Sequence, residues 1–316
     1  MGIPATRYTY GPVPSRRLGR SLGVDLVPFK TCSYDCIYCQ LGRTTNRTTE
    51  RREYVPVAAV LDELAGRLRR DPAPDFIGLA GSGEPTLHAR IEDLIAGIKE
   101  MTGVPVAVLT NGSLLSVPEV RAGLARADLV LPSLDAGDAR SFARVNRPHP
   151  DIPFDRMTEG LVSFARGFRG TIRLEVFVLA GITDTPEEIG RIAAIAERMR
   201  PACVQLNTVA RPPAEHDALA VSRETLDGLR RLFSCPCEVV AESRAAGPAG
   251  PAGGGAVEES ILGLLARRPC TVEGLAVGLG LPPNEVVKHL EVLGAGGAVR
   301  PVRRVDAVFY ERVRRP

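Results

Sequence analysis

The chain has 316 residues, of which 44% are hydrophobic, so it is long enough to form one large domain with a smaller one beside it. Its formal net charge of +3 is too small to indicate a nucleic-acid-binding protein by itself, and no apolar run approaches the roughly 20 residues of a membrane span. The first residues lack the pattern of a secretory signal, and a reducing compartment would keep the cysteines free for metal, so we expect a cytoplasmic protein without a membrane partner.

Strand-like and helical stretches alternate through the first three quarters of the chain. Such alternation predicts parallel strands joined by right-handed crossover helices. Six units predict an α/β fold, a partial (β/α)6 TIM-like barrel open on one side, over residues 1–242. The active site of such a barrel lies at the carboxyl ends of the strands. The expected strands cover 21–27, 76–80, 104–110, 129–134, 172–179 and 204–209, and the expected helices cover 57–69, 91–101, 118–125, 154–164, 186–198 and 223–233.

Three cysteines follow the first expected strand in C-x3-C-x2-C spacing: Cys32, Cys36 and Cys39, with Tyr38 directly before the last. Three thiolates on so short a loop can hold three irons of a [4Fe-4S] cluster. The fourth iron then has no protein ligand, which makes it a reaction site. A structural zinc site needs four ligands in two spaced pairs, and no other part of the chain supplies them in register. Zinc, or a coincidental arrangement, is therefore the weaker alternative.

With this motif the sequence resembles the radical S-adenosylmethionine (SAM) superfamily, whose signature is this spacing with an aromatic residue at the position of Tyr38. The resemblance implies that Cys32, Cys36 and Cys39 are catalytic as well as metal ligands, and that SAM chelates the open iron. It also implies that one electron, from a donor such as flavodoxin or ferredoxin, splits SAM and forms a 5′-deoxyadenosyl radical. The protein then supplies orientation and the exclusion of water.

A glycine-rich motif follows the second expected strand. Residues 81–85 read Gly-Ser-Gly-Glu-Pro and resemble the glycine-glycine-glutamate motif of the family, with serine in place of the first glycine. In the family the backbone of this motif binds the methionyl ammonium of SAM, and glycines let the main chain approach the ligand closely. The resemblance assigns Gly83 and Glu84 to SAM binding, and a plain Gly-Pro turn is the alternative.

Further polar residues follow the next strands. Asn111 comes after the third expected strand and Ser133 after the fourth, and both resemble positions that reach the ribose or carboxylate of SAM. The resemblance also assigns Tyr38 to SAM binding. A structural turn role is nearly as well supported for Asn111, because its amide can satisfy local backbone groups. The sixth expected strand would lie beside adenine and bind it through main-chain groups.

Three basic residues are candidates for binding substrate. Arg144 and Arg147 follow the fourth expected strand, and an arginine pair at the mouth of a barrel can clamp a phosphate or a carboxylate. A solvated helix end is the alternative. Lys30 is the only lysine near the cysteine loop. It is either a Schiff-base lysine or a cation that balances the charge of the cluster, and the second role is favoured.

The cysteines outside the loop raise the question of an auxiliary cluster. Cys235 and Cys237 are separated by one proline, which brings two thiols together, but they need partners and only Cys203 is expected nearby. Free cysteines usually behave as small hydrophobic side chains. We therefore expect no second cluster.

The end of the chain predicts a second domain. Residues 243–256 are rich in Gly, Pro and Ala and predict a flexible linker. Three short helices and an alternating stretch follow, and over residues 257–316 they resemble a winged helix-turn-helix. Residues 300–316 hold six arginines against two acidic residues, so we expect this arm either to contact nucleic acid or to be an ordinary solvated tail. A protein is the alternative partner of the domain. The expected helices cover 257–266, 272–279 and 283–293, and the wing covers 299–313.

Within the superfamily, the closest likeness spans most of residues 8–215. It depends on the stretches 11–19, 146–148 and 205–208, which resemble a radical SAM group related to the wyosine-forming tRNA enzymes. Those enzymes carry further cysteines before the radical SAM motif, whereas this chain has none before Cys32. The difference argues against wyosine chemistry and leaves radical formation unaffected.

The sequence thus predicts a radical SAM enzyme that abstracts hydrogen from RNA, a nucleotide or another phosphate-bearing molecule. Modification of a peptide or protein is the first alternative. An iron-sulfur redox-sensing transcriptional regulator is an alternative from a different class, and the SAM motifs argue against it because a sensor does not need them.

Overall fold

The computed structural model of the protein describes residues 8–15, 17–71, 73–240, 254–304 and 307–313. Within these ranges the main sheet has eight strands, in the order β1-β2-β5-β6-β7-β8-β9-β10. All neighbours from β2 to β10 are parallel, and β1 pairs with β2 antiparallel. The strands are β1 (Thr9–Ser15), β2 (Gly19–Val24), β5 (Phe76–Leu79), β6 (Val106–Thr110), β7 (Leu129–Pro132), β8 (Thr171–Phe177), β9 (Cys203–Asn207) and β10 (Cys237–Val239).

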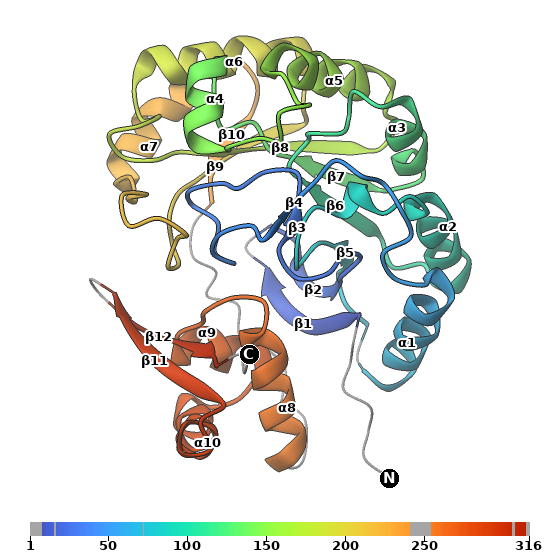
Figure 1. Ribbon diagram of the computed structural model, residues 1–316, viewed down its shortest axis with the longest axis vertical. Helices are drawn as coiled ribbons and strands as arrows, with labels where there is room; N and C mark the ends of the chain where they lie inside the picture. The colour runs from blue at the N-terminus through green and yellow to red at the C-terminus, as the bar shows by residue number, and fades with distance from the viewer. Residues whose placement is uncertain (1–7, 16, 72, 241–253, 305–306, 314–316) are drawn as a thin grey trace.

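The sheet curls but does not close, since β1 and β10 lie at the two ends of the strand order. Helices cover its outer face (Figure 1). The expectation of a partial barrel in an α/β fold is confirmed. The helices around it are α1 (Val57–Arg70), α2 (Ile91–Met101), α3 (Pro118–Leu124), α4 (Ala139–Val145), α5 (Phe154–Gly167), α6 (Pro186–Met199) and α7 (Arg223–Leu229), with single turns η1 (Pro85–Leu87) and η2 (Arg230–Leu232).

Helix α6 illustrates why these segments are helical. The side chain of Thr185 accepts a hydrogen bond from the backbone N–H of Glu188, which caps the first turn. Ile189, Ile192 and Ala196 are spaced three and four residues apart, so they lie on one face, and all three are buried against the sheet.

A plug of apolar side chains fills the amino end of the barrel. Leu18, in the turn between β1 and β2, packs with Ala107, Leu129 and Leu131, and Phe76 adds to this cluster. Phe76 and Leu129 are the first residues of β5 and β7, and Ala107 is the second residue of β6. The interior is therefore closed at the amino ends of the strands, and the space for a site is left at the carboxyl ends.

A smaller unit follows the barrel. Its own hydrophobic core includes Ile261, Leu275 and Leu290. Gly280 ends the second helix in the left-handed conformation (φ 65°), which glycine adopts without strain. The elements come in the expected order, and their assignment as a winged helix-turn-helix stays a prediction. They are α8 (Gly254–Leu265), α9 (Val272–Leu279), α10 (Pro283–Ala295) and the hairpin of β11 (Val299–Arg304) and β12 (Ala307–Arg312).

The expected linker lies mostly outside the described residues. Helix α8 begins at Gly254, within the last three residues of the predicted linker 243–256, and residues 243–253 are not described. None of the described helices is long and apolar enough to cross a membrane.

Candidate active site

The cysteine loop leaves the barrel after β2 and is held at both ends by backbone hydrogen bonds. The N–H of Lys30 donates to the carbonyl of Ser82 (2.6 Å), and the N–H of Ile37 donates to the carbonyl of Val145 (3.0 Å). Lys30 has a left-handed backbone (φ 61°), which turns the chain into the loop. A short parallel pair, β3 (Thr31–Cys32) with β4 (Asn46–Arg47), continues from this point. The loop is therefore fixed between the ends of β5 and α4.

Cys32, Cys36 and Cys39 all line one cavity of about 360 Å³, which opens at the carboxyl ends of the strands. Burial, with the charge of Glu84 as the second cause, raises the pKa of the Cys32 thiol to about 12. Burial, followed by the charge of Asp135, raises the pKa of Cys36 well above its ordinary value. Thiolates at these positions need a compensating positive charge, which bound iron supplies.

Two side-chain amides donate to the sulfur atoms. The Nδ2 atoms of Asn111 and Asn146 lie 3.5 Å from Sγ of Cys32 and Cys36, respectively. Hydrogen bonds to ligand sulfur are a known means of tuning iron-sulfur clusters. Three buried thiols in one cavity, with N–H donors directed at two of them, fit a [4Fe-4S] cluster.

A single zinc ion fits less well. Within the described ranges, no group of three His, Cys, Asp or Glu side chains could hold one metal ion. Zinc needs its ligands around one centre, whereas a cubane spreads three thiolates over three separate irons. The observation therefore counts against zinc and is compatible with a cluster.

The glycine-rich motif lies directly against the cysteine loop. A Cβ atom on Gly83 would stand 1.8 Å from the carbonyl oxygen of Thr31, so only glycine fits there. Gly81 is also restricted, because its φ of 141° is accessible mainly to glycine and a Cβ would meet Asp25 Oδ1 at 1.9 Å. Both glycines are thus explained by the close approach of the two loops that border the cavity.

The carboxylate of Glu84 is buried and joins the end of β5 to the end of β6. Its Oε1 accepts from the hydroxyls of Thr86 and Thr110 (both 2.6 Å), and its Oε2 accepts from the N–H of Asn111 (2.7 Å). Burial raises the pKa of this carboxyl, and these hydrogen bonds oppose the shift. Glu84 therefore holds the backbone of two cavity loops in place.

Asn111 and Ser133 both line the cavity, with different surroundings. Besides the sulfur contact, Asn111 Nδ2 donates to the hydroxyl of Ser33 (2.9 Å), and its Oδ1 accepts from the N–H of Ser113 (2.9 Å). The Ser133 side chain receives and donates no hydrogen bond within the described part of the chain, so its hydroxyl is available to a ligand.

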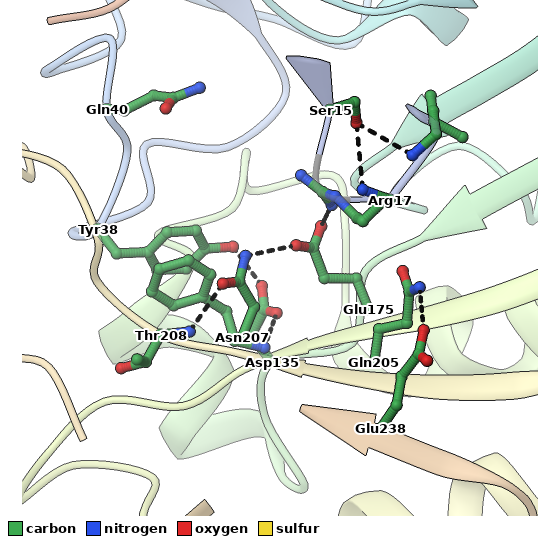
Figure 2. A network of polar contacts seen from close by, with 12 residues as sticks. Ser15, Arg17, Tyr38, Gln40, Asp135, Glu175, Gln205, Asn207, Thr208 and Glu238 are labelled. Atoms are coloured by element: carbon green, nitrogen blue, oxygen red, sulfur yellow. Dashed lines mark hydrogen bonds and ion pairs between the residues drawn. The ribbon is translucent and has the colours of Figure 1, made fainter. Parts of the chain in front are cut away.

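Tyr38 lies at the mouth of the barrel, where its ring stacks on that of Phe177 with 4.0 Å between centroids and 9° between planes. Its hydroxyl donates to Asp135 Oδ2 (2.5 Å), as Figure 2 shows. Burial raises the pKa of Asp135 to about 6, against the hydrogen bonds that it accepts from Tyr38 and Asn146. The aromatic residue of the motif is therefore rigidly placed.

An ion pair crosses the interior of the barrel. Arg17 of the β1–β2 turn pairs with Glu175 of β8, and Glu175 Oε1 accepts from Nδ2 of Asn207 (2.9 Å) (Figure 2). Arg17, Glu175 and Asn207 all line the cavity. The sequence does not predict that Arg17 pairs with Glu175, because the contact depends on how the turn enters the barrel.

The three substrate candidates do not come together. Lys30 lines the cavity. Burial raises the pKa of the Cys39 thiol, and the positive charge of Lys30 opposes this shift. Arg144 is exposed on α4, and Arg147 pairs with Glu215 (2.7 Å). Neither arginine lines the cavity.

The remaining barrel cysteines lie at the opposite end of the strands. Cys203 begins β9, Cys237 begins β10 and Cys235 precedes it, whereas the cavity lies at the carboxyl ends. Burial raises the pKa of all three thiols. The expectation that they hold no cluster stays a prediction.

Comparisons with known proteins agree with this arrangement. The sequence profile described as the Radical SAM superfamily matches residues 26–196, more than half of the chain. The UPF0026 protein of Helicobacter pylori (strain J99) is 36% identical over 289 residues, which cover 90% of this chain and 91% of that protein. The GTP 3′,8-cyclase of Chlorobaculum tepidum is 29% identical over 173 residues, 53% of this chain and 48% of that protein.

A protein of Brachyspira hyodysenteriae named GTPase Obg is 40% identical over 296 residues, which cover 93% of this chain. The chain spans only 44% of the length of that protein. The lysines here, Lys30, Lys99 and Lys288, all follow a residue other than glycine, so the Gly-Lys pair of a phosphate-binding P-loop is missing from this sequence.

Solved structures share the fold. A radical SAM methyltransferase from Sphaerobacter thermophilus matches with a TM-score of 0.54 at 16% identity, over 71% of this chain and 67% of that one. Streptococcus suis SuiB, bound to S-adenosylmethionine, matches with a TM-score of 0.51 at 16% identity, over 69% of this chain and 50% of that one. The expected cofactors, SAM and a [4Fe-4S] cluster, are those of the superfamily. The chain belongs to the radical SAM superfamily and, within it, to the UPF0026 family.

Proposed function

We propose that the protein is an enzyme that cleaves SAM reductively at a [4Fe-4S] cluster held by Cys32, Cys36 and Cys39. One electron from an external donor, such as flavodoxin or ferredoxin, breaks the bond between sulfur and C5′ of SAM. Methionine leaves, and the 5′-deoxyadenosyl radical takes a hydrogen atom from the substrate to become 5′-deoxyadenosine. The observation that carries the proposal is that all three thiols line one cavity with the glycine-rich motif and Ser133.

The side chains of this cavity have distinct proposed roles. Asn111 and Asn146 direct N–H groups at the ligand sulfurs. Glu84 and Gly83 fix the loop that receives the methionyl end of SAM, and the free hydroxyl of Ser133 binds a polar group of SAM. Tyr38, stacked on Phe177, forms part of the wall that excludes water from the radical.

For the substrate we propose a nucleotide or RNA. The similarity to a GTP 3′,8-cyclase, whose name refers to a nucleotide, supports this class. So does the basic lining of the cavity, to which Arg17, Lys30 and Arg268 belong. A peptide or protein substrate is the alternative, since SuiB has also been solved with its precursor peptide.

The test is to reconstitute the full chain anaerobically, to reduce it with SAM present and to measure 5′-deoxyadenosine by mass spectrometry. The wild type is expected to bind about four irons per chain and to form 5′-deoxyadenosine. Cys36→Ala is expected to lose both. Cys203→Ala is the matched control, because this cysteine lies away from the cavity, and it should keep both.

Two results would contradict the proposal. A wild-type protein with a full cluster that forms no 5′-deoxyadenosine would favour a redox-sensing regulator. A full cluster in Cys36→Ala, or its loss in Cys203→Ala, would overturn the assignment of the ligands.

A further inference from the structure

The C-terminal unit forms one wall of the cavity. Leu264, Arg267 and Arg268 belong to this unit and line the same cavity as the three loop cysteines. Helices α8 and α9 pack against β1, and Tyr10 of β1 joins the hydrophobic core of the unit (Figure 1). The cavity is thus built from both ends of the chain.

Arg267 is fully engaged in holding this wall in place. Its Nε donates to Oδ2 of Asp25 (2.8 Å), and the side chains of the pair are only 12% and 9% exposed. The other carboxylate oxygen of Asp25 accepts from the backbone N–H of Ser82 (2.5 Å), in the glycine-rich motif. The guanidinium also lies over the ring of Tyr10, 4.5 Å from its centroid.

Arg268 stands next to this pair but has no such partner. Within the described ranges, no carboxylate comes within ion-pair distance of its guanidinium, whereas Arg17 of the same cavity pairs with Glu175. Arg268 and Tyr10 line the same cavity, and the charge of Arg268 opposes the rise that burial causes in the pKa of the Tyr10 hydroxyl. A half-buried arginine that lines a cavity without a counter-ion is suited to bind an anion from solution.

We propose that Arg268 binds a phosphate group of the substrate, so that the C-terminal unit supplies a substrate contact and Arg267 positions it. The inference deepens the proposed function and rests on it. The planar guanidinium offers parallel N–H donors that match two phosphate oxygens. Lys30 and Arg211 also line this cavity, but Lys30 lies at the base of the cysteine loop and Arg211 donates to Oε1 of Gln40 (3.2 Å).

The test is calorimetric titration of the reconstituted full chain with inorganic pyrophosphate. Arg268→Ala is expected to weaken binding roughly 10- to 100-fold, the range expected for one charge-assisted contact. The affinity of Arg268→Lys is expected to lie between those of the wild type and Arg268→Ala, because lysine keeps the charge and loses the paired donors. The matched control is Arg223→Ala, an exposed arginine of α7 that does not line the cavity, and it should bind as the wild type does.

Two further titrations separate the sources of the phosphate. If GTP binding depends on Arg268, the substrate is a small nucleotide, and if only binding of a short single-stranded RNA does, the substrate is RNA. Either result supports the proposal. Wild type that binds none of these probes, Arg268→Ala that binds them as tightly as wild type, or an acidic peptide that binds in their place would overturn it.

The assay of 5′-deoxyadenosine in the same preparation distinguishes this inference from the proposed function. If the wild type forms no 5′-deoxyadenosine, the proposed function fails whatever calorimetry gives. If it does form this product and Arg268→Ala still binds pyrophosphate normally, only the role of Arg268 is rejected.

Discussion

Asn146 connects two functional groups through a single amide. Its Nδ2 donates to Sγ of Cys36 (3.5 Å) and to Oδ2 of Asp135 (2.8 Å). An N–H group near a ligand sulfur stabilises the reduced, more negative state of a cluster. The contact is therefore expected to make the cluster easier to reduce.

Removing this amide should lower the reduction potential of the cluster. A hydrogen bond of about 0.5–1.5 kcal/mol corresponds to roughly 20–60 mV for a one-electron couple. We expect a shift of this size in Asn146→Ala, measured by redox titration with electron paramagnetic resonance. Asn284→Ala, at an exposed position of α10, is the control, and an equal potential in all three proteins would contradict the role of Asn146.

Asp135 gives the cluster-free protein a pH-dependent stability. Burial raises the pKa of this carboxyl from 3.8 to about 6, so the folded state binds its proton more tightly than the unfolded state. The protonated Asp135 contributes to the free energy of unfolding. This contribution, about 3 kcal/mol at most, is fully present below pH 4 and is lost as the pH rises through 6. We expect the wild type to lose stability relative to Asp135→Asn between pH 4 and pH 6.5, measured by urea unfolding.

The difference between the two proteins isolates this residue from other titrating groups. Asp62→Asn, at an exposed position of α1, should follow the wild type over the same pH range. A constant difference between wild type and Asp135→Asn would show that Asp135 keeps an ordinary pKa.

At the scale of single elements, the β1–β2 turn has the clearest structural role. Leu18 is 4% exposed and fills the amino end of the barrel with Ala107, Leu129 and Leu131. The same turn carries Arg17 to Glu175 on the far side of the interior. One hairpin thus closes the bottom of the barrel and supplies part of the cavity.

Leu18→Ala should therefore destabilise the protein by about 2–4 kcal/mol, through lost burial and a residual cavity. The measurement is the free energy of unfolding in urea. Leu219→Ala makes the same change at a position that is 56% exposed and should cost less than about 0.5 kcal/mol. Equal effects of the two substitutions would mean that the turn does not plug the barrel.

The sequence predicted the long periodic elements and missed several shorter ones, among them β1, β10 and α4. Six expected strands correspond to β2 and β5 to β9, because continuous apolar runs mark buried parallel strands. Strand β1 contains Pro12 and Pro14, which break a strand pattern but are tolerated on an edge strand. Strand β10 has three residues and α4 has seven, too few for a clear period.

The site was predictable where chemistry depends on spacing within one loop. Cys32, Cys36 and Cys39 follow from their spacing, and all three line the cavity. Neither the place of Arg268 in the cavity nor the pairing of Arg17 with Glu175 could be found in this way, because both depend on packing between distant segments. Gly83 was singled out for SAM binding, yet its lack of a side chain is already required by Thr31.

At the scale of the whole molecule, the flexible linker predicts a separable C-terminal unit, so that truncation after Ala241 would leave SAM cleavage intact. The contacts favour a different outcome. Without Arg267, the buried Asp25 carboxylate would lose its charged partner while still holding Ser82. Leaving one member of a buried ion pair alone typically costs about 3–5 kcal/mol.

We therefore expect Arg267→Ala to destabilise the protein by about 3 kcal/mol and to weaken SAM binding, measured by urea unfolding and by equilibrium dialysis. Arg300→Ala breaks a pair with Glu311 in which the arginine is 69% exposed, and it should cost less than about 1 kcal/mol. Arg267→Ala with wild-type stability and SAM affinity would show that the two parts are independent.

The pair between Asp25 and Arg267 also sets an order of events during synthesis. The two residues are separated by 242 positions along the chain. At about 5–20 residues per second, a ribosome needs roughly 12–48 s to travel from one to the other. During that interval the nascent barrel carries its cysteines and glycine-rich loop without the wall that holds Asp25. Maturation of the metal centre is then expected only after Arg267 and its neighbours have been synthesised and have folded onto the barrel.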